Sequence, residues 1–256
     1  MSEDLVLVER HGSVALLTLN VPKKRNALSR WLARALADAL ETAALDKDVR
    51  ALVLNGGAHF CAGGDLDDLA IPALEMRAAM QHGHRAIRAL TGGRLPVVAA
   101  VQGSAFGAGF ALALACDFIV VDANSTFGSA FAKVGLTPDY GMLWSLPQRV
   151  GMGTAREILM FAEPIKGEQA KAIGLADRLV ETGQVLPAAL ELAAKLAALP
   201  PGTVATTKAV LSRTPMALDP MLAWEADTQA MMVGTADFAE GIKAFAERRA
   251  AVFKGA

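Results

Sequence analysis

The chain has 256 residues, which is enough to bury a full core in one domain or in two small ones. Its 25 Lys and Arg residues balance 26 Asp and Glu residues, so charge gives no case for a nucleic-acid partner. Cys61 and Cys116 lie in apolar surroundings, which indicates buried small side chains in a reducing compartment rather than a disulfide scaffold. The acidic start has no basic segment followed by an apolar one, so we expect a cytoplasmic protein.

Short apolar runs alternate with helical patterns in the first half of the chain. Residues 5–8 and 14–18 flank His11 and Gly12 and predict a hairpin. Ser29 predicts the N-cap of a helix, because leucines follow it at helical spacing. Buried strands are predicted over three further apolar runs, at residues 51–54, 97–101 and 118–121. Strands separated by helices favour an α/β architecture with parallel strands.

The apolar stretch 96–121 is long enough to resemble a membrane span. It contains Gln102, Ser104, Asp117 and three glycines, so a strand, a turn, a buried helix and a second strand explain it better. From residue 187 onward the sequence is rich in alanine and helical in pattern. The predicted helices cover residues 189–199, 204–211, 221–233 and 237–252.

Two glycine-rich turns are the most informative motifs, at residues 60–65 (FCAGGD) and 103–109 (GSAFGAG). Each lies where an apolar strand gives way to a helical pattern. Backbone N–H groups are free in the first turn of a helix and can point into a shared pocket. One N–H group from each turn would form an oxyanion hole, in which each donor is worth roughly 3–4 kcal/mol of transition-state stabilisation.

These two segments resemble the signature stretches of the crotonase (enoyl-CoA hydratase/isomerase) superfamily. Supporting matches lie at residues 25–29, 96–101, 115–120 and 173–180. The resemblance implies a right-handed spiral of ββα repeats with the active site in residues 1–187. It also implies a C-terminal helical region, residues 188–256, that assembles trimers or hexamers and forms part of the coenzyme A site. The substrate would be an acyl-CoA thioester, with no other cofactor and no membrane partner.

The resemblance assigns the oxyanion donors to the backbone N–H groups of Gly64 and Ala108. The second position is usually glycine in the family, but alanine keeps the donor if its φ angle stays negative. The two glutamates of the family's hydratases correspond here to Ala111 and Phe131. Neither side chain can transfer a proton, and water addition needs both a base and an acid, so hydratase chemistry is disfavoured.

A carboxylate follows Pro138 directly, at Asp139. In the superfamily, an acid at this place marks the double-bond isomerases of fatty-acid and phenylacetate degradation. The stretch 127–147 looks most like the phenylacetate-pathway ring-opening isomerases. The resemblance implies that Asp139 takes the α proton of the thioester and returns it at the γ carbon, with a pKa raised by an apolar pocket. Without the resemblance, Asp139 would be expected to cap the following helix.

Three alternatives stay open at this point. One is a hydratase that uses Asp139 and water. A second is a dehalogenase-like enzyme in which Asp139 is a nucleophile aided by His84, although Phe131 stands where that branch has tryptophan. The third is a non-catalytic acyl-CoA-binding homologue. His82 and His84 lie on different helix faces with no third ligand nearby, so no metal site is expected.

The resemblance also implies the contacts to coenzyme A and to the acyl group. The coenzyme A contacts are expected to fall on Arg25, Ala62, Asp65, Leu66 and Lys254, where Lys254 would meet the 3′-phosphate on its own or on a neighbouring subunit. The expected lining of the acyl pocket comprises Phe106, Phe131 and Met142, together with Met76 and Met80.

Overall fold

The computed structural model describes residues 4–255, so the Met1, Ser2 and Glu3 on which the cytoplasmic expectation partly rests lie outside it. Its centre is a six-stranded sheet with the strand order β1-β2-β3-β4-β6-β9. These strands are β1 (Val6–His11), β2 (Val14–Leu19), β3 (Ala51–Asn55), β4 (Val97–Val101), β6 (Phe118–Asp122) and β9 (Arg178–Val180). The β1–β2 hairpin is antiparallel and the other neighbours are parallel. The expected α/β class with parallel strands is therefore confirmed.

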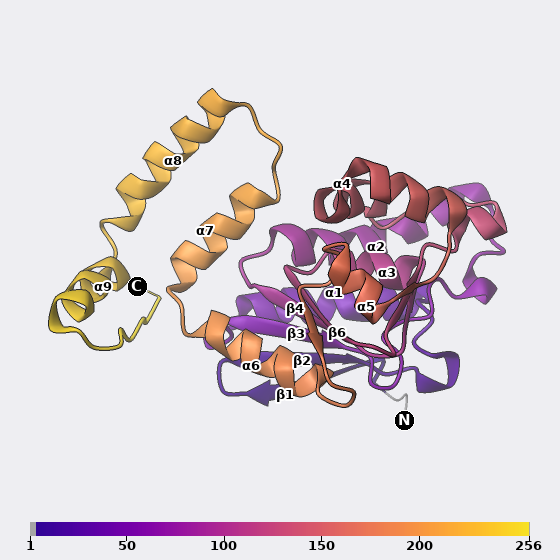
Figure 1. Cartoon of the computed structure of the whole chain (residues 1–256), viewed down its shortest axis with the longest axis horizontal. Coiled ribbons are helices and arrows are strands. Elements are labelled where there is room, and N and C mark those ends of the chain that lie inside the picture. The colour runs from indigo at the N-terminus through magenta and orange to yellow at the C-terminus, as the bar shows by residue number, and fades with distance from the viewer. Residues whose placement is uncertain (1–3, 256) are drawn as a thin grey trace.

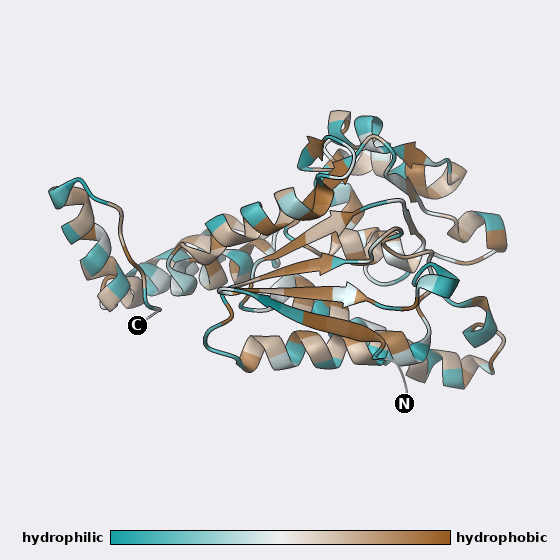
Figure 2. Cartoon of the chain, turned by 90° about the horizontal axis from the view of Figure 1, so that it is seen from below, coloured by the Kyte–Doolittle hydropathy of each residue, from teal (hydrophilic) through white to brown (hydrophobic). Residues whose placement is uncertain are grey.

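Both faces of the sheet are buried along β2, β3, β4 and β6, whereas β1 at the edge is mostly exposed. Side chains of alternate residues point to opposite faces of a strand. Leu17, Leu52 and Ala99 pack into the larger core beneath α1 (Arg30–Leu45) and α3 (Ala108–Leu114). Leu16 and Val53 instead meet α6 (Val185–Ala197) on the other face. Continuous apolar strands suit a position between two helix layers, and Figure 2 shows their mostly brown colour.

Helix α1 begins where the sequence predicts. The Ser29 side chain accepts a hydrogen bond from the N–H of Leu32, which satisfies one of the free donors at the helix start. The buried face of α1 includes Leu32, Leu36 and Leu40, the residues whose spacing indicated a helix. Helix α2 (Ala73–Gly92) runs beside α1 and covers the same side of the sheet.

A second, three-stranded sheet lies next to the strand-to-helix turns. Its strands are β5 (Ser104–Phe106), β7 (Thr126–Gly128) and β8 (Ile165–Lys166), in the order β5-β7-β8. The remaining elements of this half are α4 (Met142–Phe161), α5 (Gly167–Ala172) and the short 3₁₀ segments η1 (Pro22–Lys24), η2 (Leu66–Asp68) and η3 (Phe131–Val134). The small sheet holds β5 directly before the start of α3.

The C-terminal region is helical, as expected. After α6 come α7 (Pro201–Leu211), α8 (Leu218–Met232) and α9 (Ala236–Glu247), which lead away from the sheet in Figure 1. Helix α9 ends five residues earlier than the pattern predicted, because Arg248 takes a left-handed conformation with φ 55°. The predicted division at residue 187 falls inside α6, which packs on the sheet, so that division stays a prediction.

A buried ion pair connects the C-terminal helices to the core. The Lys208 ammonium group of α7 donates to the Asp117 carboxylate at 2.6 Å and to the carbonyl of Leu95 at 2.8 Å. Asp117 in turn accepts from the N–H of Val97 at the start of β4. Across residues 4–255, no helix combines the length and the apolar content that crossing a membrane requires.

Candidate active site

The two glycine-rich turns lie against each other at the carboxyl ends of β3 and β4. Cys61 forms a parallel bridge with Ala105, in which the N–H of Cys61 donates to Ser104 and the N–H of Phe106 donates to Cys61. The two turns can come this close only because residues at their contact are small. A Cβ atom on Gly109 would collide with the carbonyl group and side chain of Cys61. Glycine at this position therefore lets the start of α3 sit on the first turn.

The loop before α1 holds the first turn from its other side. The buried Asn26 side chain donates to the carbonyl groups of Gly56 and His59, both at 2.8 Å. Leu28 donates to Gly63 at 2.7 Å and accepts from Asp65 at 3.2 Å. Gly64, which lies between these two partners, is therefore fixed in position.

The predicted oxyanion donors lie at the ends of these turns. Ala108 is the first residue of α3, so its N–H group has no carbonyl partner in the helix. Among residues 4–255, no backbone carbonyl accepts from the N–H of Gly64 or of Ala108. Ala108 is not among the described residues with positive φ, so the alanine meets the condition for keeping its donor.

Gly64 and Ala108 line one small cavity of about 60 Å³. Most of the other lining side chains are apolar and come from the loop before α1, from the segment after η2 and from α2. They are Leu28, Leu69, Ile71, Met76, Ala79 and Met80. The cavity is completed by Arg30, Asp65, Asp68, Asp139 and Tyr140. The structure thus brings Gly64, Ala108 and Asp139 together from three separate parts of the chain.

Asp139 is the carboxylate in this cavity that lacks a counter-charge. Its Oδ1 atom is buried and has no hydrogen-bond partner among residues 4–255. Burial raises the pKa of the carboxyl group to about 6, because the charged form loses its hydration. The other two carboxylates are paired: Asp65 with Lys24 at 2.8 Å, and Asp68 with Arg30 at 3.9 Å. Asp139 is therefore the group suited to exchanging a proton near neutral pH.

The capping alternative for Asp139 is wrong. Helix α4 starts at Met142, its N-cap is Gly141, and no side chain caps it. The carbonyl of Asp139 instead accepts from the N–H of Met142 at 2.9 Å and closes a tight turn. Tyr140 and Gly141, at the centre of the turn, have φ angles of 50° and 77°, as in a type I′ turn. This turn leaves the Asp139 side chain free to face the cavity.

Tyr140 was not predicted as a site residue, yet it lines the cavity beside Asp139. A left-handed conformation costs a bulky residue about 1–2 kcal/mol, and such strain gathers at functional sites. Gly83 of α2 makes room for the ring, because a Cβ atom there would collide with the ring and hydroxyl of Tyr140. No local sequence signal pairs residues 83 and 140, so only the tertiary contact reveals this arrangement.

A family model described as enoyl-CoA hydratase/isomerase matches residues 9–256, nearly the whole chain. The chain belongs to the enoyl-CoA hydratase/isomerase family. The resemblance seen in the glycine-rich turns is thereby confirmed, and an acyl-CoA substrate fits the family.

Several relatives in this family are similar over their full length. The chain is 36% identical to the 2,3-dehydroadipyl-CoA hydratase of Escherichia coli K12, over all of both chains. It is 32% identical to the 1,2-epoxyphenylacetyl-CoA isomerase of the same organism, over 98% of this chain and 99% of the relative. The crystal structure of an enoyl-CoA hydratase from Polaromonas sp. JS666 superposes with a TM-score of 0.91 at 34% identity, covering 97% and 99% of the two chains. Relatives with both activities are thus comparably similar.

Three of the predicted acyl-pocket residues, Phe106, Phe131 and Met142, are not part of the cavity lining. Met142 is fully buried and Phe131 nearly so, and both belong to the main hydrophobic core. Phe131 begins η3 and its ring lies over Gly107, while Phe106 packs against Gly128. Met76 and Met80 do line the cavity, as expected from the sequence.

The predicted coenzyme A residues fall into two groups. Ala62 donates to the carbonyl of the exposed Arg25, and Leu66, 72% exposed, begins η2 after Asp65. These four residues lie together around the first glycine-rich turn. Lys254 lies near α9 instead, where its N–H donates to Asp237 at 2.7 Å. Any contact between Lys254 and coenzyme A stays a prediction.

His84 does not line the cavity, although its ring centroid lies 6.5 Å from that of Tyr140 in an edge-on arrangement. To assist Asp139, the His84 side chain would have to reach the cavity wall beside it, and Tyr140 occupies that part of the wall. Within residues 4–255, no cluster of three or more His, Cys, Asp or Glu side chains could hold a metal ion.

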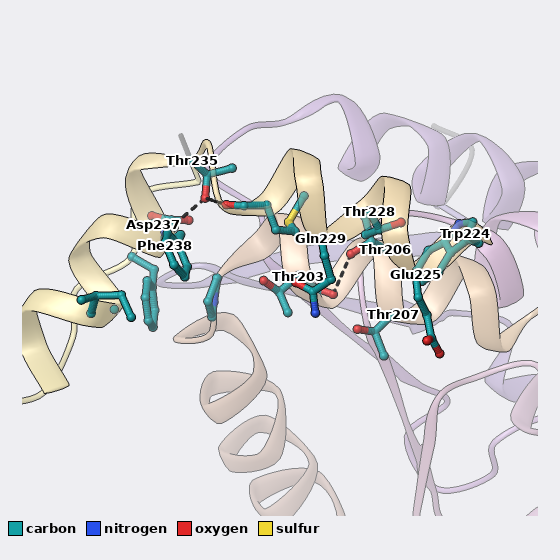
Figure 3. Close-up of a pocket in the computed structure, with 15 residues that line it drawn as sticks. Thr203, Thr206, Thr207, Trp224, Glu225, Thr228, Gln229, Thr235, Asp237 and Phe238 are labelled. Carbon is teal, nitrogen blue, oxygen red and sulfur yellow. Dashed lines mark hydrogen bonds between the residues drawn. The ribbon is translucent and has the colours of Figure 1, made fainter. Parts of the chain in front are cut away.

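A second, larger cavity of about 470 Å³ lies among the C-terminal helices α7, α8 and α9. Figure 3 shows Thr203, Thr206 and Thr207 on one wall and Thr228 and Gln229 on another. The Thr206 hydroxyl donates to its own helix, at the carbonyl of Gly202, and Asp237 accepts two backbone N–H groups. Among the described residues, no side-chain polar atom of this cavity is both fully buried and without a hydrogen-bond partner. In this respect the cavity differs from the one that holds Asp139.

Proposed function

We propose that this family member is an acyl-CoA isomerase that shifts a carbon–carbon double bond through a thioester dienolate. The single observation that carries the proposal is the unpartnered Asp139 carboxylate, which faces the same small cavity as the N–H groups of Gly64 and Ala108. A raised pKa of about 6 suits a group that must both accept and return a proton.

The reaction needs one base and one oxyanion hole. Asp139 removes a proton from the carbon between the thioester and the double bond, and the electron pair moves into the thioester carbonyl. Gly64 and Ala108 donate hydrogen bonds to the oxygen, where the negative charge then lies. The protonated Asp139 returns the proton at the γ carbon, the double bond moves into conjugation, and the carboxylate is regenerated.

Hydration is the second candidate, because relatives such as the 2,3-dehydroadipyl-CoA hydratase carry that name. Two features of the site argue against it. Ala111 is buried within α3 and Phe131 lies in the core, so neither supplies an acid or a base. Asp65 and Asp68 also line the cavity but are engaged in ion pairs. A hydratase would have to activate water and protonate carbon with Asp139 alone.

The test is the isomerisation of a 3-enoyl-CoA by the wild type and by Asp139→Asn. We expect the variant to lose about 10²–10⁴-fold in kcat, the usual contribution of a general acid–base group. Asp68→Asn is the matched control, because it removes a charge from the same cavity but leaves the proposed base, and it should keep kcat within about threefold. Undiminished isomerisation in Asp139→Asn would exclude the assigned role.

A second measurement separates enolisation from the choice of product. The α protons of a saturated acyl-CoA exchange with deuterium if the enzyme forms an enolate, and mass spectrometry detects this exchange. Rapid exchange that Asp139→Asn abolishes supports Asp139 as the base. Hydration of crotonyl-CoA above about 1 per second would instead favour the hydratase. Binding without exchange or turnover would favour a non-catalytic or dehalogenase-like protein.

We also propose that the C-terminal helices assemble the chain into trimers or hexamers. Large apolar side chains are exposed on them, including Ile242 at 58% and Phe245 at 86%. Such a concentration of exposed apolar surface is typical of an interface. Sedimentation of Phe245→Glu should give a smaller species than the wild type. An unchanged sedimentation coefficient would argue against an interface at α9.

A further inference from the structure

Tyr140 is the only tyrosine of the chain, and the proposed mechanism leaves it without a role. It directly follows Asp139 and lines the same cavity. Its ring is 9% exposed, so the side chain is almost fully enclosed by protein. A polar aromatic side chain beside the proposed base is therefore placed to meet the acyl group of a substrate.

The position of Tyr140 is determined from two sides. Its left-handed backbone, shared with Gly141, directs the side chain toward α2 rather than along α4. On α2, the absence of a side chain at Gly83 provides the space that the ring and hydroxyl occupy. His84, the next residue of α2, meets the ring edge-on. Strain that is held in place by its surroundings indicates a position selected for function.

Within residues 4–255, burial and the charges of Asp139 and Cys61 act on the Tyr140 hydroxyl, and no hydrogen bond does. The hydroxyl is not among the fully buried polar atoms that lack a partner, so part of its surface stays accessible, and Tyr140 lines the cavity. Burial raises the pKa of this hydroxyl, so it stays protonated at neutral pH and acts as a donor.

The carboxylates of the cavity lining do not accept from this hydroxyl, because Asp65 and Asp68 are held in ion pairs and Asp139 acts on Tyr140 through its charge alone. Leu69, Ile71, Met76 and Met80 are apolar. A donor enclosed by apolar groups loses its hydration when a ligand fills the cavity, unless the ligand supplies an acceptor. An acyl chain made only of carbon and hydrogen would leave this donor unsatisfied, whereas an oxygen atom on the chain would satisfy it.

We propose that Tyr140 determines acyl specificity by donating a hydrogen bond to an oxygen atom on the acyl chain. The substrate class is then acyl-CoA thioesters that carry a hydroxyl or carbonyl oxygen beyond the reacting carbons. This inference rests on the proposed function only in placing the acyl group in the cavity with Asp139.

The test measures binding, so it does not depend on turnover. Calorimetry gives Kd values for hexanoyl-CoA and for its analogues with a hydroxyl group on carbon 4, 5 or 6. We expect the wild type to bind at least one analogue about tenfold more tightly than hexanoyl-CoA. Tyr140→Phe keeps the ring but lacks the hydroxyl. In this variant the Kd values for that analogue and for hexanoyl-CoA should become about equal, while the Kd for hexanoyl-CoA changes less than threefold.

A second variant tests the packing that positions the hydroxyl. Gly83→Ala places a methyl group where the ring lies, so it should also remove the preference although the hydroxyl is retained. Gly153→Ala, on α4, is the control for adding a methyl group to a helix, because nothing lies within 4 Å of that methyl group, and it should keep the preference.

Two results would overturn the inference. A wild type that binds all four thioesters equally, or a preference that survives Tyr140→Phe, would show that the hydroxyl does not read the acyl chain. Either result accompanied by intact α-proton exchange would leave the isomerase proposal standing. Failure of every acyl-CoA to bind would overturn both.

Discussion

Two of the cavities formed by residues 4–255 make an informative comparison, because the larger one lacks the buried, unpartnered carboxylate that the smaller one holds. The cavity among the C-terminal helices, about 470 Å³, holds the buried Asp237, which accepts from the N–H groups of Lys254 and Gly255. The cavity at the glycine-rich turns, about 60 Å³, holds Asp139, whose Oδ1 atom has no partner among residues 4–255. An unpaired buried polar group costs about 1–3 kcal/mol, so it persists mainly where a ligand can compensate. The candidate active site is therefore chosen for its buried, unpartnered carboxylate and not for its volume.

After the loss of the Asp139 carboxylate itself, the largest effect is expected from separating the two glycine-rich turns. In Gly109→Ala the new methyl group meets the backbone of Cys61, so α3 must shift and the N–H of Ala108 moves relative to that of Gly64. We expect kcat to fall about 10²–10³-fold, as for loss of one oxyanion donor. The measurement is the isomerisation rate on protein whose fold is checked by circular dichroism. A rate close to that of the wild type would show that catalysis does not depend on the relative position of these two N–H groups.

The next effect is on the pH dependence of activity. Asp139 must be ionised to act as a base, and burial raises its pKa to about 6. kcat/KM should therefore be level above about pH 7 and fall about tenfold per unit below pH 6. The profile is measured from pH 5 to 9, with Asp139→Asn as the control. The break should disappear in that variant, and a wild-type profile that stays flat down to pH 5 would contradict the assignment.

Stability should change in the opposite direction to activity. A carboxyl group whose pKa rises from 3.8 unfolded to about 6 folded destabilises the fold when ionised. This penalty is absent below the unfolded pKa, grows as pH rises and is complete above the folded pKa. Asp139→Asn should therefore be about 3 kcal/mol more stable than the wild type at pH 8 and less than about 1 kcal/mol more stable at pH 4. Urea unfolding at one protein concentration measures both values, and destabilisation at pH 8 would be inconsistent with the raised pKa.

In contrast to Asp139→Asn, Asp237→Asn should lower the free energy of unfolding. Its effect is the smallest of those predicted here. Its carboxylate accepts from two backbone N–H groups at 2.7 and 2.9 Å, which the neutral amide replaces only in part. We expect a loss of about 1–2 kcal/mol in unfolding free energy. kcat should change less than threefold. A large loss of kcat without a loss of stability would place chemistry in the C-terminal cavity.

Local sequence rules predicted the elements that carry the site. Strand β3, strand β4, the Ser29 cap and the glycine-rich turns each depend on residues close together in the chain, so spacing and residue type suffice to find them. The positions of Gly64, Ala108 and Asp139 came from the family resemblance, and the structure brings these residues to one cavity.

The expected cap at Asp139 failed as a prediction from the residues alone. A Pro-Asp pair before a helix is equally compatible with a cap and with a tight turn. The turn prevails here because Tyr140 and Gly141 adopt left-handed conformations and move the start of α4 to Met142. What decides between the two is the packing of Tyr140 on α2, which no local pattern contains.

The sequence by itself determined the α/β class, the family and the carboxylate on which the proposed reaction depends, because these follow from local backbone preferences and from short motifs. Only the tertiary structure decided which side chains line the cavity. It placed Phe131 and Met142 in the core and Tyr140 in the cavity wall, against Gly83. The reason is that the direction of a side chain depends on the space left by segments far away in the sequence, and that space exists only once the elements have packed.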